Sequence, residues 1–235
     1  MTNRAETSSP TASRFLATGD MACPPELLDL AASSAPKPFG FVRAIGEATL
    51  ETARAAAAAK LAVPILIGEA DIIKQDAAAI GWDLDGVEII PADGEDGAIA
   101  AAIALFGEGR VAGLAKGQLH TDVFMGGIVK RAAGIRTGKR LVHLFAMLPP
   151  KGGRPLLISD AAVNVAPDIE KRVEAALHMA EMSRRLGQSR PRIPVLSATE
   201  SILPAMPSSG EAAEIALRAG AIHIKADFAC PLTID

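Results

Sequence analysis

The chain has 235 residues, of which 49% are hydrophobic and 22% are charged, and its formal net charge is -3. This composition can build a hydrophobic core and excludes a disordered chain. The negative charge and the low aromatic content of 3%, with no tyrosine, argue against nucleic acid or an anionic membrane surface as a partner.

The two cysteines and the start of the chain indicate a cytoplasmic protein. Cys23 and Cys230 are far apart in the sequence, which suits neither a disulfide framework nor a zinc site. Two free thiols in a reducing compartment are a simpler interpretation than a bridge. Residues 1–14 are polar and lack the apolar core of a signal peptide, so we expect a flexible tail. No apolar run approaches the ~20 residues that a membrane-spanning helix needs.

The first half of the chain alternates predicted helices with short apolar runs that predict buried strands. Helices are predicted over 46–63, 70–82, 95–109 and 121–134, and strands over 64–69, 87–92 and 111–117. Alternation of this kind is typical of βαβ units and a mainly parallel sheet. The sequence therefore predicts the α/β class.

A different pattern begins near residue 138. Two apolar strands, joined by the turn-rich "PPKGG", predict a two-stranded meander. The expected elements are strands at 139–148, 154–160, 192–198 and 221–227, and helices at 166–187 and 208–220. Ser208 or Ser209 is expected to cap the last helix, and His143 and His223 are expected to pack within strands. We therefore predict a first lobe over 15–137 and a second over 138–235.

The candidate chemistry lies where predicted strands end, because ligands of open α/β sheets bind outside the carboxyl ends of the strands. One strand ends at Lys116 and Gly117, and the next helix starts near Thr121. Free N–H groups at the helix start, the lysine charge, the glycine, and donors from His120 and Thr121 would suit a phosphate or an acyl phosphate. Alternatively, Thr121 only caps the helix, Lys116 is solvated and His120 is incidental.

Two further corners are polar. Asp160 and Asn164 follow one strand, and Ser197, Glu200 and Ser208 follow another. Ordinary turn chemistry and helix capping explain such residues equally well. No G-x-S-x-G, H-E-x-x-H or C-x-x-C motif is present, and the histidines show no metal-ligand spacing. Composition and spacing alone predict an α/β protein with several corners that suit anions, and no metal site.

Six segments in a defined order nevertheless resemble one known family. They are "PILIGE", "GRVAGLAKGQLHTD", "GIRTGKRLVHLFAM", "PLLISDAAVNVAPDIEKR", "VLSATESILPAMPSSGEA" and "PLTID". On these segments the chain resembles the phosphate acetyl/butyryl transferase family, and its butyryltransferase-like branch more than the acetyltransferases. The resemblance extends from about residue 40 to the end of the chain.

The resemblance implies two α/β lobes with an active-site cleft between them, as in the isocitrate/isopropylmalate dehydrogenase architecture. It implies reversible transfer of a short acyl group between coenzyme A and inorganic phosphate. The expected partners are acyl-CoA, phosphate and acyl phosphate, with coenzyme A as a substrate and no tightly bound cofactor or metal. A homodimer or a larger homo-oligomer is also expected.

The resemblance also assigns roles to residues. The loop "KGQLHT" matches the family loop that faces phosphate or acyl phosphate, and Asp160 and Asn164 match the family's "D-x-A-V-N" corner. Glu200, Met206, Pro207 and Ser208 match the segment bordering the cleft in the second lobe, and Asp235 matches the aspartate of "G-P-L-x-x-D". The catalytic candidates are His120, Thr121 and Asp235. The substrate-binding candidates are Lys116, Gly117, Asp160, Asn164, Ser197, Glu200 and Ser208.

Two departures from the family pattern affect these expectations. Cys230 stands where the last motif usually has glycine. Family members also continue beyond the position of Asp235, into a segment whose serine–arginine pair and later aspartate are the chief catalytic groups of the acetyltransferase branch. We therefore expect a truncated chain that lacks activity alone. The alternatives are a regulatory module that binds coenzyme A or acyl phosphate within a fusion enzyme, and an oxidoreductase of related architecture, which would need a clustered metal site.

Overall fold

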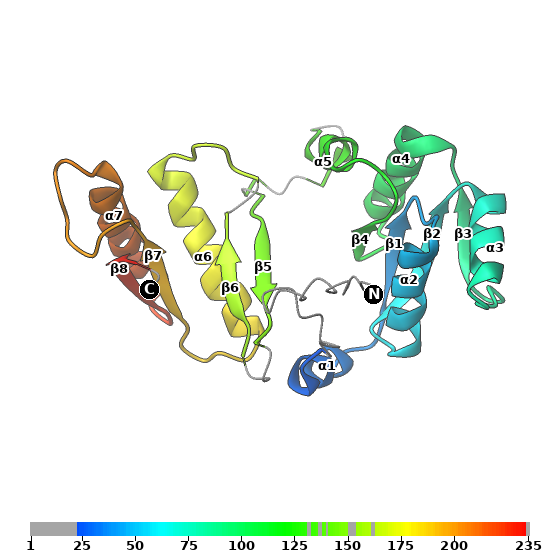
Figure 1. Ribbon diagram of the computed structural model, residues 1–235, viewed down its shortest axis with the longest axis horizontal. Helices are drawn as coiled ribbons and strands as arrows, with labels where there is room; N and C mark the ends of the chain where they lie inside the picture. Colours follow the sequence, from blue (N-terminus) through cyan, green and yellow to red (C-terminus); the bar gives the residue numbers. More distant parts are fainter. Residues whose placement is uncertain are drawn as a thin grey trace, which may run out of the picture.

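A computed structural model describes residues 23–130, 133–135, 138–139, 141–149, 154–160 and 163–233. Its largest sheet has four parallel strands in the order β3-β2-β1-β4 (Figure 1). The strands are β1 (Lys37–Val42), β2 (Ala62–Gly68), β3 (Glu88–Pro91) and β4 (Gly113–Lys116). Because all four run in the same direction, their carboxyl ends share one edge of the sheet.

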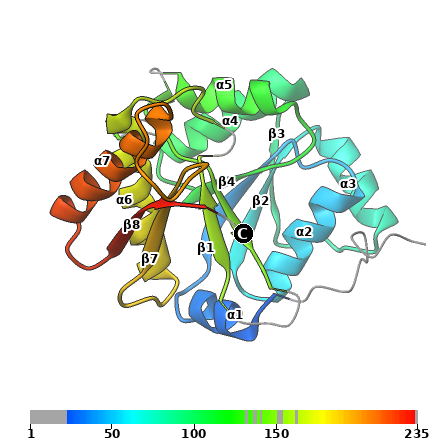
Figure 2. The ribbon, with the colours of Figure 1, turned by 60° about the vertical axis from the view of Figure 1, so that its left-hand side comes forward.

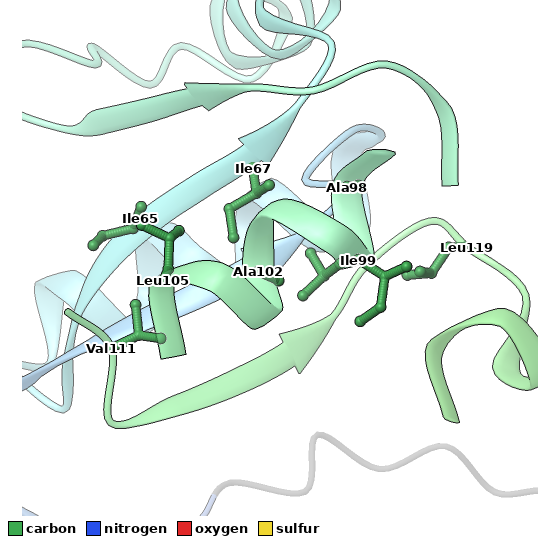
Figure 3. Close-up of a cluster of buried hydrophobic side chains, with 9 residues drawn as sticks. Ile65, Ile67, Ala98, Ile99, Ala102, Leu105, Val111 and Leu119 are labelled. Atoms are coloured by element: carbon green, nitrogen blue, oxygen red, sulfur yellow. The ribbon is translucent and has the colours of Figure 1, made fainter. Parts of the chain in front are cut away.

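Helices cover both faces of this sheet, and side chains alternate between the faces as the strand pleat requires. The helices are α2 (Glu47–Ala58), α3 (Ala70–Ala79), α4 (Gly94–Gly107) and α5 (Thr121–Val129), and α1 (Pro25–Ala32) precedes β1. Phe41 and Leu66 pack with residues of α2 and α3. Val42 and Ile67 lie in the other cluster, which includes residues of α4. Figure 3 shows Ile67 in this cluster beside α4. The sheet is therefore buried on both sides.

The later elements form two smaller sheets. An antiparallel pair joins β5 (Leu144–Met147) to β6 (Leu156–Ser159), and a parallel pair joins β7 (Arg192–Leu196) to β8 (Asp227–Leu232). Two helices, α6 (Ile169–Arg185) and α7 (Pro207–Ile222), pack together through a buried cluster. Figures 1 and 2 show these elements beside the four-stranded sheet, with α5 between the two groups along the chain.

The structure confirms the α/β class, the mainly parallel sheet and the antiparallel meander. Both cysteines are free. Within the described ranges, no helix has the length and apolar character to cross a membrane. The expected tail over 1–14 lies outside the described residues, and the lobe boundary at 137/138 stays a prediction.

Several elements differ from the prediction. No element was predicted where the structure has α1 and β1. The helix predicted over 46–63 ends at Ala58, because Lys60 adopts a positive φ of 55° and the chain turns into β2. The last strand was expected over 221–227, but α7 continues to Ile222, and the strand begins at Asp227.

The two histidines expected within strands lie outside them. His223 follows the last residue of α7 as its C-terminal cap. His143 immediately precedes β5, and its ring meets the Phe145 ring edge-on at 4.2 Å between centroids. These positions make His143 a packed residue and His223 a helix-end residue.

Candidate functional site

An open pocket of about 630 Å³ lies at the carboxyl edge of the four-stranded sheet. Val42 of β1 pairs with Lys116 of β4, so the residues that follow these two strands are neighbours. The pocket is lined, among others, by Arg43 after β1, Asp76 of α3, and His120 before α5. It therefore occupies the position at which open α/β sheets bind ligands.

Arg43 is the central cation of this pocket. Its φ of 52° is unusual for a residue other than glycine and turns the chain at the end of β1. Its guanidinium donates to Glu69 Oε1 at 3.1 Å and to the Gln118 carbonyl at 3.1 Å. A longer contact of 3.4 Å reaches Glu95 Oε1. Arg43 therefore ties the ends of β1, β2 and β4 to the start of α4.

Burial and hydrogen bonding act against each other at Glu69. Burial alone would raise the pKa of this carboxyl, but hydrogen bonds from Arg43 and backbone N–H groups outweigh it and hold the pKa below its ordinary value. One oxygen, Oε1, accepts the bonds from Arg43 and from the Gly94 N–H, whereas the buried Oε2 has no partner among the described residues. Glu69 is thus an ionised structural acid under the pocket.

Glu95 and His120, which both line the pocket, are in direct polar contact. Glu95 Oε2 accepts the His120 backbone N–H at 3.0 Å, and Oε1 lies 2.8 Å from the ring Nδ1. The backbone N–H of His120, its ring and the Arg43 charge hold the pKa of Glu95 below its ordinary value. The Glu95 side chain is 21% exposed, whereas that of His120 is 80% exposed. The carboxylate is therefore partly covered, while the imidazole faces solvent.

Carboxylates of the chain already occupy three helix starts at this edge. Asp76 accepts the Gly46 N–H before α2 at 2.7 Å, Glu69 accepts the Gly94 N–H of α4 at 3.2 Å, and Glu95 accepts the His120 N–H before α5. Each offsets unpaired N–H groups and the partial positive charge of a helix start. Each carboxylate takes one N–H group, so further first-turn N–H groups stay available at these helix starts, those of α5 among them.

The start of α5 and the end of β4 keep donors available. Within the described part of the chain, the backbone N–H groups of Thr121, Asp122 and Val123 have no acceptor. The Lys116 backbone pairs with Val42 in the sheet, whereas its side chain is exposed and makes no hydrogen bond or ion pair to a described residue. A free ammonium group and free helix N–H groups within one loop form an arrangement that can bind phosphate.

Two predicted roles in this loop need correction. Thr121 is the first helical residue and not the cap; the cap position is His120, and its side chain makes no capping bond. Gly117 approaches the chain and not an open pocket, since a Cβ there would lie 2.5 Å from the Arg43 carbonyl oxygen. Gly117 thus permits close packing of the strand ends.

In the second predicted site, after β6, the two polar side chains bond to each other. Asn164 Nδ2 donates to Asp160 Oδ1 at 2.7 Å and to the Leu141 carbonyl at 3.2 Å. Asp160 has a positive φ of 60°, a conformation that Asp tolerates better than most residues. The pair braces the turn after β6, as the alternative of turn chemistry predicts.

The third predicted corner follows β7. The backbone N–H of Ser197 pairs with the Leu232 carbonyl at 2.9 Å, and Glu200 Oε1 accepts from Thr233 Oγ1 at 3.5 Å. The Ser197 hydroxyl is buried and has no partner among the described residues. Ser208 is exposed in the first turn of α7.

The expected serine cap of α7 is wrong. Met206 holds the cap position, and Pro207 starts the helix. The Ser209 hydroxyl is buried, donates to the Met206 carbonyl at 2.7 Å and accepts the Leu203 N–H at 2.9 Å. Ser209 therefore holds the loop before α7 in place.

The structure joins only some of the predicted site residues. Lys116, Gly117, His120 and Thr121 share one loop, and Asp160 contacts Asn164. No hydrogen bond or ion pair between described residues links the three corners. Asp235 lies outside the described residues. No group of three or more His, Cys, Asp or Glu among the described residues is arranged to hold a metal ion.

Sequence reasoning missed Arg43, Glu69, Asp76 and Glu95. Arg43 had a usable signal, because it directly follows the apolar run "FGFV", and strand ends are where polar site residues are expected. Glu95 had none, since an acid in a first helical turn is common. Its contact with His120 joins residues 25 positions apart and depends on how α4 and α5 pack.

Comparison with known families and proteins gives consistent matches. Residues 93–235 match the family model described as Phosphate acetyl/butaryl transferase. A phosphate acetyltransferase of Rhizobium meliloti is 37% identical over 169 residues, which is 72% of this chain and 54% of that protein. A phosphate butyryltransferase of Clostridium acetobutylicum is 29% identical over 167 residues, 71% of this chain and 56% of that protein. The chain thus spans about half the length of these curated relatives.

Solved structures show the same fold. A branched-chain phosphotransacylase from Enterococcus faecalis V583 superposes with a TM-score of 0.68 at 21% identity, covering 84% of this chain and 68% of that one. A phosphotransacetylase from Streptococcus pyogenes gives a TM-score of 0.70 at 14% identity, covering 88% and 72%. The arrangement of sheets and helices is therefore shared with these proteins.

Proposed function

The chain belongs to the phosphate acetyl/butyryl transferase family, and we propose that it contributes to a site at which a short acyl group passes reversibly between coenzyme A and inorganic phosphate. This proposal depends on one observation, the set of hydrogen-bond donors in the loop between β4 and α5 that are unpaired within the described part of the chain. The loop lies within the matched residues and includes a lysine side chain without a partner among the described residues, five positions before the free N–H groups that begin at Thr121. These donors suit the phosphoryl group that both directions of the reaction share.

In this proposal the loop binds the anion and the remaining candidates line the substrate path. Lys116 and the N–H groups of α5 bind phosphate or acyl phosphate, the Thr121 hydroxyl donates to it, and His120 presents its exposed ring to the reacting groups. Gly117 keeps the strand ends close enough to form the loop. This division assigns binding to backbone and lysine, and proton transfer to the imidazole.

The other corners are proposed to contact the rest of the substrates. Asp160 and Asn164, together with Ser197, Glu200 and Ser208, would bind parts of acyl-CoA, and Asp235 would act with His120 and Thr121 in catalysis. Coenzyme A serves as a substrate and not as a resident cofactor. The match of residues 93–235 to the family model, which includes all of these positions, supports these assignments.

We also propose a cytoplasmic homodimer or larger homo-oligomer. The outward face of the β5–β6 hairpin supports self-association, because the cross-strand pairs Phe145–Ile158 and Met147–Leu156 are apolar and exposed. The two free cysteines support a reducing compartment.

The direct test is thiol release from acetyl-CoA and butyryl-CoA in phosphate buffer. It compares the 235-residue chain with a chain extended to the length of the relatives. Turnover by either chain supports acyl transfer, and turnover by the longer chain alone places decisive groups outside these residues. No turnover by either chain would refute the activity. Coenzyme A titration would then test the alternative of a regulatory binding module.

A second test addresses the loop. Lys116→Ala and Thr121→Ala should each weaken binding of acetyl phosphate by about tenfold, because each removes a donor to a charged group. The matched control is Lys74→Ala, which removes an exposed lysine from α3. Isothermal titration measures the affinities, and circular dichroism verifies folding. If both variants fold and bind acetyl phosphate with unchanged affinity, the loop does not bind the anion, and its polar side chains are only solvated.

A further inference from the structure

Arg43 lines the open pocket, yet most of its hydrogen-bond donors are already used within the chain. Its Nε and Nη2 donate to Glu69 Oε1 at 3.1 Å, and its Nη1 donates to the Gln118 carbonyl at 3.1 Å and to Glu95 Oε1 at 3.4 Å. These bonds occupy four of the five N–H groups that a guanidinium has. Arg43 therefore has little left to offer a bound anion.

The positive charge of Arg43 is also neutralised, because Glu69 and Glu95 both pair with it. Despite burial at Glu69, hydrogen bonds hold the pKa of both carboxyls below the ordinary value, chiefly from Arg43 at Glu69 and from the His120 N–H at Glu95. Two ionised carboxylates beside one guanidinium give the group a net negative charge, which repels a phosphate. The Lys116 side chain has no ion pair to a described residue, so its charge remains for the anion.

The same hydrogen bonds connect Arg43 to the loop between β4 and α5 at two points. Gln118 is held at both ends of its backbone, since its N–H donates to the Arg43 carbonyl at 3.0 Å and its carbonyl accepts from the guanidinium. The second connection passes through Glu95, which accepts the His120 N–H at 3.0 Å, one residue before α5 begins. Arg43 therefore contacts the loop on the side that leads into the first turn of α5.

We propose that Arg43 is a positioning residue for the anion-binding loop: its guanidinium fixes the Gln118 carbonyl and Glu95, and so holds the N–H groups at the start of α5 in place for a phosphoryl group that Arg43 itself does not touch. This proposal rests on the proposed function of the loop and deepens it. The backbone of Arg43 supports it, because a positive φ of 52° at a residue other than glycine persists only where the surrounding structure fixes it, and such residues gather at functional sites.

The first test needs no substrate. Arg43→Gly removes the side chain but keeps the turn, because glycine adopts a φ of 52° readily. Hydrogen exchange of the 235-residue chain, followed by NMR, should show about tenfold faster exchange of the His120 N–H, since Glu95 loses its anchor. Lys60→Gly is the matched control, because Lys60 is exposed and has a φ of 55° at the opposite edge of the sheet, before β2. Unchanged exchange at His120 in folded Arg43→Gly would overturn the proposal.

The second test separates a positioning residue from a direct ligand by titration with acetyl phosphate. Glu69→Gln keeps an oxygen that can accept from Arg43 but removes the negative charge that neutralises it. Asp76→Asn is the matched control, because Asp76 lines the same pocket but bonds to the Gly46 N–H instead. A direct ligand would bind acetyl phosphate more tightly in Glu69→Gln than in Asp76→Asn, and that result would overturn the proposal. The positioning role predicts equal or weaker binding in Glu69→Gln.

The Arg43 variants complete this titration. Arg43→Gly should bind acetyl phosphate about tenfold more weakly, and Arg43→Lys should not restore the affinity, because one ammonium group cannot reproduce the planar fork that reaches Glu69, Glu95 and Gln118 together. Full affinity in Arg43→Lys would overturn the positioning role. If the unaltered chain does not bind acetyl phosphate, the proposed function of the loop fails. Unchanged exchange at His120 refutes the role of Arg43 even where acetyl phosphate binds, so the two failures are distinguishable.

Discussion

Replacing Gly117 with alanine tests the packing that forms the site loop. The added Cβ would lie 2.5 Å from the Arg43 carbonyl oxygen and 2.6 Å from that of Val42. Both contacts are with backbone, which cannot rotate away as a side chain can. Separating the strand ends would instead stretch two hydrogen bonds, from Gly117 N to Val42 O at 2.9 Å and from Gln118 N to Arg43 O at 3.0 Å. The substitution must therefore cost either contact strain or hydrogen bonds.

The expected magnitude follows from these two terms. Overpacking costs about 1–3 kcal/mol, and each weakened hydrogen bond costs about 1 kcal/mol. We expect Gly117→Ala to lower the free energy of unfolding by about 2–4 kcal/mol. For a chain of this length the melting temperature should fall by about 5–15 °C. The effect should extend to the loop, since Arg43 and Gln118 both move with the strand ends.

Thermal unfolding followed by circular dichroism measures the change. The matched control is Gly126→Ala in α5, where an added Cβ meets no atom within 4 Å. That variant should gain about 0.5–1 kcal/mol, because alanine stabilises a helix interior relative to glycine. Equal melting temperatures for the two variants would refute the packing argument and return Gly117 to a role in binding.

Three further predictions concern stability. Leu66→Ala removes a fully buried side chain from β2 and should lower the urea midpoint by an amount equivalent to about 2–5 kcal/mol; a loss below about 1 kcal/mol would contradict the assigned core. Asp168→Ala removes the carboxylate that accepts the Lys171 N–H at 2.9 Å at the start of α6 and should cost about 1 kcal/mol in thermal melts, whereas an unchanged melt would contradict the cap. Hydrogen bonds from Arg190 hold the pKa of Asp227 in the folded chain below its ordinary 3.8. The stability that this ion pair adds is therefore present above pH 3.8, and it is lost as the pH falls through the lower pKa of the folded state. Asp227→Asn should flatten the acid limb of stability against pH, and an unchanged limb would show that the pair contributes nothing.

The sequence alone determined those elements whose signals are local. The runs at 64–69 and 87–92 are short, apolar and flanked by helical periodicity, and both became strands of the parallel sheet. Turn-rich "PPKGG" between two apolar runs predicted the antiparallel pair of β5 and β6. The loop from Lys116 to Thr121 was located correctly because strand ends and helix starts can be recognised from neighbouring residues.

Only the tertiary structure determined the strand pairings, helix packing and side-chain contacts that join residues far apart in the chain. β1 contains glycine and proline, which weaken a strand signal, yet it pairs with both β2 and β4 inside the sheet. α7 packs on α6 through Ile215 and Ala219, a contact between elements that are separated along the chain by β7. Glu95 reaches His120 only because α4 and α5 pack on the same face of the sheet. Local propensity cannot specify such contacts, since their stability comes from burial and charge pairing that exist only after the chain has folded.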